Sequence, residues 1–371
     1  MDQTGVVLSV DFGTAFIRAA RTALMASSGA VAPQLLEFGR LPKLRNVICL
    51  DKDRTRGREI GEDVFASGMD ESAASQVHQW VPPDDQSAPD SELGRVIRLF
   101  LARVRESAGL NRPPDAAAAD WQTACACAFG ASLQQIEAQE KLFRAAEFPN
   151  PKGYDSALAA LAWHTRSSPQ PGAYLVIDCG ATETRFAVCE LDRAGSRKVV
   201  RTARSQPGGR DFDRLLAERL RSQLRLGNSL SLIESLELTR CAELLKEGFS
   251  RAWSQDKTSY EMVCQIGDVN GIAELRLDEF QALASMLQRS FTDSAAMTLS
   301  QANLTPQALA GVIVVGGGAL WPWVGNWART TFGSSRVQIG QFPEESIVCG
   351  LALLAAEASV RQPELPQPPP I

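Results

Sequence analysis

Residues 5–22 read GVVLSVDFGTAFIRAART: an apolar run, a short polar turn and a second apolar run. This pattern predicts a β-hairpin with strands at 5–10 and 15–22 and a turn at 11–14. Asp11, Gly13 and Thr14 place an acid, a glycine and a hydroxyl at the tip of the hairpin. Such a tip suits a phosphate, because a glycine-rich turn lets backbone N–H groups approach an anion.

A second hairpin of the same kind is predicted at residues 173–191, which read AYLVIDCGATETRFAVCEL. Its strands are expected at 173–177 and 184–191, and its turn again begins with Asp-x-Gly, here Asp178-Cys179-Gly180. Two such hairpins indicate a duplicated architecture with one phosphate turn in each half. Each copy taken alone leaves an ordinary hairpin turn as an equal alternative, because Asp-x-Gly is common there.

The remaining segments alternate between helical and extended patterns. Apolar spacing predicts helices at 93–108, 133–146, 154–164, most of 211–247 and 351–359. Residues 309–315 read as a buried strand that is closed by Gly316, Gly317 and Gly318. Five prolines between 361 and 371 predict an extended tail, since proline cannot join the interior of a helix or a sheet.

Composition excludes several classes of protein. Of the 371 residues, 44% are hydrophobic and 22% are charged, which is typical of a globular chain and not of a disordered one. The net charge of −5 leaves no global basic surface for nucleic acid. No apolar run approaches the roughly 20 residues that cross a bilayer. We therefore expect a cytoplasmic protein with neither nucleic acid nor a membrane as its partner.

The eight cysteines indicate a reducing compartment. Most of them stand among apolar residues, which favours buried thiols over disulfides. Cys125 and Cys127 form a CxC pair, but no second pair has the spacing of zinc ligands. We expect no structural zinc site.

The order of the segments resembles the ATPase domain of the DnaK-type heat-shock chaperones, in the actin and sugar-kinase superfamily. Five stretches match in order between about residues 6 and 359. They are VDFGT at 10–14, IDCGAT at 177–182, GGRDFD at 208–213, VVGGG at 314–318 with Pro322, and PEE at 343–345 continuing to Gly350. Each stretch is weak alone, and five in order make the resemblance specific.

The resemblance implies a site for ATP or ADP with Mg²⁺. It implies that Asp11 and Asp178 hold the metal ion through its waters, and that Asp155 joins them in catalysis. The residues implied to contact the nucleotide are Gly13, Thr14, Gly180, Ala181, Thr182, Gly208, Gly209, Glu243, Lys246, Ser250, Gly316, Gly317 and Gly318.

Two of these assignments have a structural alternative. Asp155 stands where the family has a glutamate, and it is equally well placed to cap a helix beginning at Ser156. Glu243 and Lys246 are three residues apart, a spacing that any exposed helix face also shows. Within the alignment we favour nucleotide contact for this pair.

Several departures from the family predict weak catalysis. Phe65 stands where the chaperones have a lysine beside the γ-phosphate, and the nearest cations in sequence are Arg54, Arg56 and Arg58. Phosphoryl transfer depends on positioned positive charge, so this loss slows the reaction.

The nucleotide side departs as well. Glu183 adds a carboxylate to the second phosphate turn, although its side chain is free to point away from the phosphates. Glu247 and Leu320 replace two arginines that sandwich the base in the chaperones, which weakens adenine binding.

The fold implied is α/β, with two lobes around a nucleotide cleft and a mixed five-stranded sheet in each lobe. Lobe I is expected at 1–170, with 38–118 as its small upper subdomain and a last helix, 344–360, that packs back on it. Lobe II is expected at 171–343, with 212–292 as its upper subdomain. Residues 361–371 are expected to form the Pro-rich tail.

The function implied is a stand-alone DnaK-like nucleotide-binding protein with a slow or impaired ATPase, acting as a chaperone-like switch. The sequence shows no chaperone-type linker or peptide-binding domain after the last helix, so an ordinary foldase cycle is not expected. The alternatives are a nucleotide-free pseudo-ATPase scaffold and, with less support because of GGRDFD, a filament-forming bacterial actin.

A separate protein is expected to bind the lobes and sense the nucleotide state. The tail offers a PxxP spacing at 363–366, but we favour the lobes. Trp253, Tyr260 and Met262 would mark an interface if all three were exposed.

Overall fold

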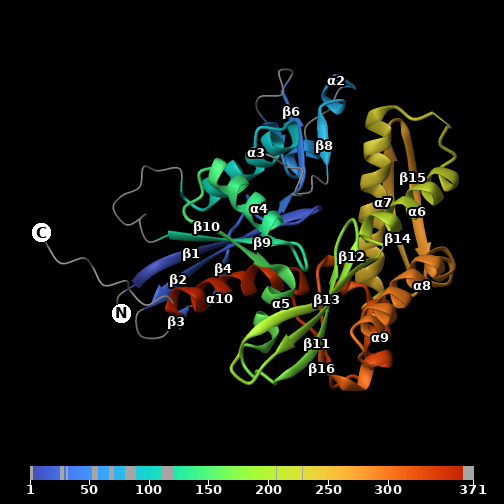
Figure 1. The fold of residues 1–371 in the computed structure, drawn as a ribbon. Coiled ribbons are helices and arrows are strands. Elements are labelled where there is room, and N and C mark those ends of the chain that lie inside the picture. Colours follow the sequence, from blue (N-terminus) through green and yellow to red (C-terminus); the bar gives the residue numbers. More distant parts are fainter. Residues whose placement is uncertain are drawn as a thin grey trace, which may run out of the picture.

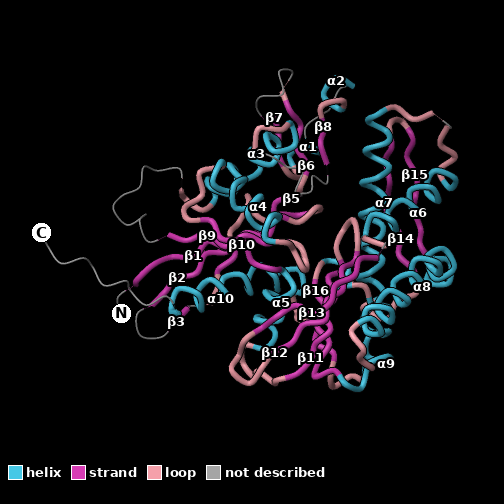
Figure 2. Tube along the Cα trace, in the orientation of Figure 1, coloured by secondary structure: helices cyan, strands magenta, loops and turns pink. Residues whose placement is uncertain are grey.

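The computed structural model describes residues 3–25, 29–30, 32–51, 57–66, 71–79, 89–110, 121–205, 207–227 and 229–361. Two β-sheets form the lower part of the molecule as drawn in Figure 1, and a smaller unit of helices and strands stands above each sheet. Figure 2 shows the same arrangement coloured by secondary structure. Arg54, Arg56 and the tail from residue 362 lie outside the described residues, as does the side chain of Arg58.

The first sheet contains the N-terminal hairpin and has seven strand segments within the described residues, which occupy the five positions expected. Its main order is β10-β9-β1-β2-β3, and β4 and β5 also pair with β2. The segments β3, β4 and β5 have two residues each and pair with successive stretches of β2, so together they form the fifth position of the sheet. The strands are β1 (Gln3–Phe12), β2 (Phe16–Met25), β3 (Gly29–Ala30), β4 (Gln34–Leu35), β5 (Leu44–Arg45), β9 (Trp121–Cys127) and β10 (Pro151–Asp155).

The second sheet contains the other predicted hairpin and has five strands in the order β13-β12-β11-β16-β17. The first three are antiparallel neighbours, and β16 and β17 run parallel to β11, so the sheet is mixed as expected. The strands are β11 (Gly172–Cys179), β12 (Thr184–Leu191), β13 (Arg197–Ser205), β16 (Leu309–Val315) and β17 (Val337–Ile339).

Two helices, α5 (Ser156–Thr165) and α10 (Ser346–Arg361), lie between the two sheets (Figure 1). Their apolar faces share one buried cluster with Val7 of β1 and Ile313 of β16. The helices cross so closely at Gly350 that a Cβ there would lie 1.9 Å from the carbonyl oxygen of Ala159. Helix α5 begins two residues later than expected, because residues 151–155 form β10.

The unit above the first sheet is a small sheet flanked by helices. Its strands have the order β7-β6-β8. Helix α3 packs Phe100 edge-on against Phe12 of β1, which ties this unit to the N-terminal hairpin. The elements are β6 (Val47–Leu50), β7 (Gly57–Ile60), β8 (Val77–Gln79), α1 (Asp63–Ala66), α2 (Glu71–Ala74), α3 (Glu92–Ser107) and α4 (Leu133–Ala145).

The unit above the second sheet is a β-hairpin packed against long helices, and its core is aromatic. Phe280 stacks on Trp321 with ring centroids 4.8 Å apart and contacts Phe249 at 5.5 Å. The elements are α6 (Gly209–Gln223), α7 (Leu232–Trp253), β14 (Ser259–Ile266), β15 (Val269–Arg276) and α8 (Leu277–Gln301). Helix α9 (Pro322–Phe332) lies lower, beside the second sheet (Figure 1).

The structure does not expose the three residues that would have marked an interface in this unit. Trp253, Tyr260 and Met262 are partly buried and pack against the core cluster of this unit, and the Trp253 ring, at the end of α7, contacts Phe249 and Phe280. The opposite face of the β14–β15 hairpin carries the exposed pair Val263 and Ile272, which are direct cross-strand neighbours.

All eight cysteines lie in described parts of the chain, and each is buried and free, as the sequence predicts. None of the helices in the described ranges combines the length and apolar character needed to span a bilayer.

Candidate functional site

The tips of the two predicted hairpins meet. The hydroxyl oxygens of Thr14, between β1 and β2, and Thr182, between β11 and β12, are 3.4 Å apart. We call this meeting point of residues 13–14 and 180–182 the turn junction. Each turn follows an aspartate, Asp11 or Asp178, so two Asp-x-Gly turns from separate sheets converge on one place.

The later glycine motifs pack against the second turn. The backbone N–H of Gly209 donates to the carbonyl oxygen of Gly180 at 3.0 Å, and Arg210 N–H donates to Ala181 at 2.8 Å. Gly208 lies so close that a Cβ there would be 2.3 Å from the carbonyl carbon of Thr182. The first N–H groups of α6 are therefore used to hold the second turn of the junction in place.

The glycines after β16 complete this side of the junction. Gly316 has a φ of 84°, and a Cβ there would lie 2.5 Å from Oδ1 of Asp178. A Cβ on Gly318 would lie 2.7 Å from the Cβ of Cys179, whereas Gly317 faces open space. The structure therefore gathers most of the phosphate-side residues predicted from the sequence around one turn.

Each aspartate faces an arginine across its own hairpin. Asp11 pairs in register with Arg18, and Asp178 pairs with Arg185. Burial raises the pKa of Asp11 to about 6, while Arg18 lowers it and Asp178 raises it. Burial also raises the pKa of Asp178, and Arg185 opposes that shift. The charges of the two turns therefore act on one another.

The two arginines have different surroundings. Nε of Arg185 donates to Oε1 of Glu183 at 2.6 Å, so the extra carboxylate of the second turn points at a cation. Arg18 is 9% exposed, and its ion pair, with Glu344, is long at 3.9 Å. Glu344 lies in the short helix η4 (Pro343–Glu345), whose Pro343 carbonyl accepts from Gly316 N–H at 3.1 Å.

The acids of the junction fit a hydrated Mg²⁺ better than a directly bound one. Within the described ranges, no group of three His, Cys, Asp or Glu side chains is placed to hold a metal ion. Magnesium keeps several waters, which need acceptors. Oε2 of Glu344 is buried without a hydrogen-bond partner among the described residues, and such an acceptor can take a metal-bound water.

Asp155 is the N-cap of α5, as the structural alternative predicted. Its Oδ1 accepts from the N–H of Ala157 at 2.8 Å and of Leu158 at 3.4 Å, and its Oδ2 accepts from Gly130 N–H. Burial raises the pKa of Asp155, and these three backbone donors lower it. The carboxylate is held in place by backbone, and its catalytic role stays a prediction.

The three predicted adenosine residues lie on one face of α7 but contact different partners. Nζ of Lys246 lies 2.6 Å from Oδ1 of Asp213 and donates to the Gly209 carbonyl at 3.2 Å. Ser250 donates to the carbonyl oxygen of Leu320 at 3.1 Å. Lys246 and Ser250 thus connect α7 to the glycine motifs before α6 and after β16.

Glu243 instead belongs to an ion-pair ring that joins the two upper units. Arg45 Nη1 lies 2.8 Å from both oxygens of Glu243, and Arg45 Nε lies 2.7 Å from Glu62. Arg240 closes the ring through Glu243 at 2.9 Å and Glu62 at 3.2 Å. We call these four side chains the interlobe ring. Although burial opposes it, Arg45 and Arg240 lower the pKa of Glu243.

Phe65 supports this ring. The guanidinium carbons of Arg45 and Arg240 lie 5.9 Å and 5.6 Å from the centroid of the Phe65 ring. The position where the resemblance expects a lysine therefore carries an aromatic surface under two arginines.

Sequence reasoning did not identify Arg18, Arg185 and Arg45. The first two had a signal: both hairpins have an arginine seven residues after the aspartate, at 11 and 18 and at 178 and 185. The spacing has meaning only once the strand register is known. Arg45 had no signal, because its partners on α7 are about 200 residues away in sequence.

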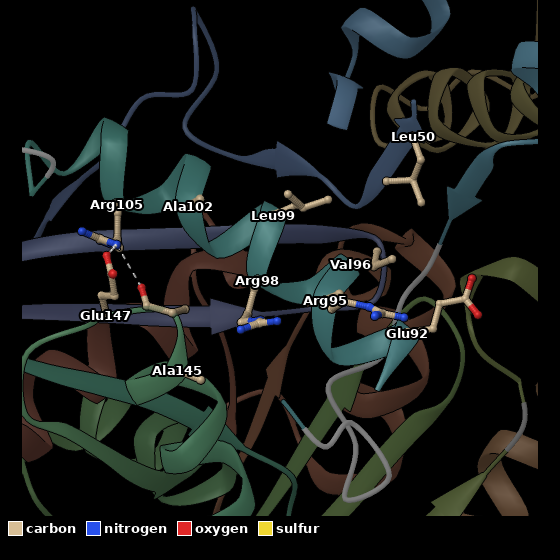
Figure 3. A pocket seen from close by; sticks show the side chains of 11 residues that line it. Leu50, Glu92, Arg95, Val96, Arg98, Leu99, Ala102, Arg105, Ala145 and Glu147 are labelled. Atoms are coloured by element: carbon tan, nitrogen blue, oxygen red, sulfur yellow. Dashed lines mark hydrogen bonds and ion pairs between the residues drawn. The ribbon is translucent and has the colours of Figure 1, made fainter. Parts of the chain in front are cut away.

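Two hollows lie outside the turn junction. The larger, about 670 Å³, follows α3 and is lined by Arg95, Arg98 and Leu99, with Glu147 at one end (Figure 3). The smaller, about 120 Å³, is lined by Arg185, Gly130 and Thr202 beside the second hairpin. Neither is lined by Gly13 or Gly180.

Comparison with known proteins identifies a family and several relatives, each of which matches about half of the chain. The family model described as Hsp70 protein matches residues 155–365. A heat shock protein homolog of Lachancea kluyveri is 26% identical over 50% of this chain and 27% of its own length. A chaperone protein HscA homolog of Aliivibrio fischeri is 28% identical over 51% of this chain and 28% of its own.

A third relative, the chaperone protein DnaK of Thermosipho africanus, is 24% identical over 53% of this chain and 34% of its own length. The chain thus spans about a quarter to a third of the curated relatives it matches. The mixed α/β architecture, with one hairpin turn from each sheet at the junction, is that of the two-lobed actin-like ATPase fold.

Proposed function

The chain belongs to the Hsp70 family, and we propose that it binds ATP and ADP at the turn junction as a nucleotide-dependent switch. The observation that carries the proposal is the contact between Thr14 and Thr182, 3.4 Å, which joins two Asp-x-Gly turns from separate sheets. Backbone N–H groups of the two turns would supply the anion-binding surface.

Different residues around the junction would bind different parts of the ligand. Asp11 and Asp178 would hold a hydrated Mg²⁺, whose chemistry there is to neutralise phosphate charge. Lys246 and Ser250 position α7 against Gly209 and Leu320, where the nucleoside part of the ligand would lie. Both oxygens of Glu243 already lie 2.8 Å from Nη1 of Arg45, so a ribose hydroxyl and the interlobe ring would share this carboxylate.

We further propose that hydrolysis is slow. Phe65 provides no positive charge of its own, and both oxygens of Asp155 already accept backbone hydrogen bonds. We expect phosphate release well below the typical enzyme median of about 10 per second. If Phe65→Lys raises the rate, the missing cation limits turnover; wild-type turnover near the median would contradict the proposal.

The interlobe ring gives the switch a structural basis. Its members are Arg45 of the first sheet, Glu62 of the unit above that sheet, and Arg240 and Glu243 of α7. A change in the separation of these parts breaks the ion pairs and alters a surface that a partner protein can bind. A partner docking on the lobes is therefore part of this proposal. The free thiols support a reducing, cytoplasmic location as a further part of it.

One observation favours the alternative of a nucleotide-free scaffold. Glu243, a predicted nucleotide contact, is already bound by Arg45 and Arg240. A thermal-shift titration with millimolar ATP, ADP and GTP, each with Mg²⁺, decides between the two. Ligand at 100 times its Kd adds about 2.7 kcal/mol, so the adenine nucleotides should raise the Tm by several degrees. If no nucleotide changes the Tm, the nucleotide-free scaffold is the alternative that remains.

A further inference from the structure

Three cations surround the ring of Phe16 at the start of β2. Lys43 Nζ lies 4.0 Å from the ring centroid, and the guanidinium carbons of Arg45 and Arg18 lie at 4.8 Å and 5.7 Å. Arg45 pairs in register with Phe16, so the two side chains share a face of the sheet. Arg18 follows Phe16 by two residues and is on the same face, together with its partner Asp11.

Only one of these three cations is fully engaged within the described residues. Arg45 has carboxylate partners at 2.7 and 2.8 Å in the interlobe ring. Lys43 has no ion pair with a described residue, although burial and the nearby Arg18 lower its pKa. It directly precedes β5, whose Leu44 pairs with Ile17, so Lys43 lies beside Arg18. The face therefore presents two cations to the junction.

Arg18 is the more unusual of the two. It is 9% exposed, yet it donates no hydrogen bond to a described residue and has one ion pair, at 3.9 Å. A guanidinium has five N–H donors, and a donor of Arg18 that no described residue accepts is open to a ligand. Arg185, its counterpart in the other hairpin, has already met Glu183 at 2.6 Å.

The surroundings of Arg18 and Glu344 point to a ligand between them. Oε2 of Glu344 is buried without a described hydrogen-bond partner, and the guanidinium of Arg18 lies only 3.9 Å from the other oxygen of Glu344 and donates no hydrogen bond to a described residue. Asp11 lies opposite Arg18, and the Gly13–Thr14 turn stands between them along the hairpin. A group rich in acceptors, with its bound water, would satisfy both side chains at once.

Resting on the proposed nucleotide site, we propose that Arg18, with Lys43 beside it, binds the phosphate chain of the nucleotide directly. A guanidinium presents two parallel N–H groups that match two phosphate oxygens, and it carries a full positive charge. The backbone N–H groups of a turn carry no such charge. The charge of Arg18 also offsets Asp11 and Asp178, which would otherwise repel a phosphate chain. The ligand class is a polyphosphate anion, and the nucleoside contributes nothing to this contact.

The test compares ligands that differ in phosphate alone. Calorimetric titrations of the full chain with Mg-ATP, adenosine and tripolyphosphate are made for the wild type, Arg18→Met and Arg21→Met. Arg21 is the matched control, because it lies on the same strand but is exposed and stacks on Trp121. We expect Arg18→Met to weaken ATP and tripolyphosphate about 10- to 100-fold, with adenosine unchanged. Arg21→Met should stay within about twofold of the wild type.

Arg18→Lys protects the test against loss of folding, since it keeps the buried charge. Lysine lacks the two parallel N–H groups of the guanidinium, so ATP should bind about 3- to 10-fold more weakly. The affinity for adenosine should again be unchanged. The loss of ATP affinity in Lys43→Met should lie between the losses in Arg21→Met and Arg18→Met. Equal loss of ATP and adenosine in the Arg18 variants, or no loss in either, would overturn the assignment.

The proposed function and this inference can fail separately. Binding of tripolyphosphate that depends on Arg18, without binding of any nucleotide, would retain Arg18 and reject the nucleotide switch. Nucleotide binding that is independent of Arg18 would retain the nucleotide switch and reject the role of Arg18. A wild type that binds neither ligand would reject both.

Discussion

The turn of the β1–β2 hairpin is held to the rest of the molecule by hydrogen bonds from Asn46, whereas the turn of the β11–β12 hairpin is held by closely packed backbone. In the first, Asn46 donates from Nδ2 to the Gly13 carbonyl at 3.0 Å and from its backbone N–H to the Ala15 carbonyl at 2.9 Å, and the adjacent strand β5 leads into the interlobe ring. In the second, Gly208 and Gly316 lie against residues 178–183 so closely that neither has room for a Cβ.

The difference shows which half of the junction can move. Backbone packing is insensitive to salt and pH, so the second turn is a fixed platform. Polar contacts can be exchanged for others of similar energy, so the first turn and its cations can follow a ligand. The arginines agree with this division, because Arg185 donates to Glu183 at 2.6 Å, whereas Arg18 has only a long ion pair, at 3.9 Å, with Glu344 among the described residues.

The largest expected effect breaks the fixed turn. Gly208→Ala places a Cβ 2.3 Å from the Thr182 carbonyl carbon, so backbone must move. We expect a loss of about 3 kcal/mol in the free energy of unfolding, measured with urea. Gly209→Ala is the control, because its Cβ would meet first the flexible Lys246 Nζ, at 3.4 Å. Equal losses in the two variants would contradict the fixed platform.

The second prediction concerns the ion pairs of the interlobe ring. Arg45→Met leaves Glu243 with Arg240 alone and should cost about 2 kcal/mol, less than removing the sole partner of a buried charge. Glu62→Gln should cost under about 1 kcal/mol, since the Glu62 side chain is 37% exposed. The cost of Arg45→Met should shrink as salt is raised, whereas that of Gly208→Ala should not. Urea unfolding in low and high salt measures both.

The third prediction concerns pH. Burial raises the pKa of Asp213 from 3.8 to about 6, Lys246 lowers it, and Glu243 and Glu247 raise it. A raised folded-state pKa means that the native state binds the proton more tightly, so stability rises as pH falls from 7 to 5. This group should add about 1 kcal/mol over that window. Asp213→Asn should lack that increment in urea midpoints, and an unchanged pH profile would contradict the assignment.

The smallest effect is the coupling between Arg185 and Glu183. Their side chains are 29% and 23% exposed, so solvent screens the pair. A double-mutant cycle with Arg185→Met and Glu183→Gln should give about 0.5 kcal/mol. A coupling above about 2 kcal/mol would mean that the second turn, too, depends on its ion pair.

Much of the fold was predictable because its signals are local. Both hairpins, helices α3 and α4 and strand β16 follow from apolar spacing and turn residues. Strand β9 was not predicted, since WQTACAC has no β-branched apolar residue and is a strand only through its pairing with β1 and β10. Helix α5 begins later than predicted because Tyr154 and Asp155 belong to strand β10.

The site was predictable where a motif recurs and not where a contact is remote. The glycines and Asp11 and Asp178 followed from the resemblance, and the structure gathers them. Arg18 required the strand register, and the Arg45–Glu243 pair required the two upper units to be placed together. A single sequence carries neither kind of information.

The most direct test of the central claim is a crystal structure of the wild-type chain grown with Mg²⁺ and saturating ATP. The two-turn account predicts a phosphate chain bound between Gly13 and Gly180, with Arg18 within hydrogen-bond distance of a phosphate oxygen. An unliganded turn junction at saturating nucleotide, or a nucleotide bound instead in the hollow along α3, would contradict it.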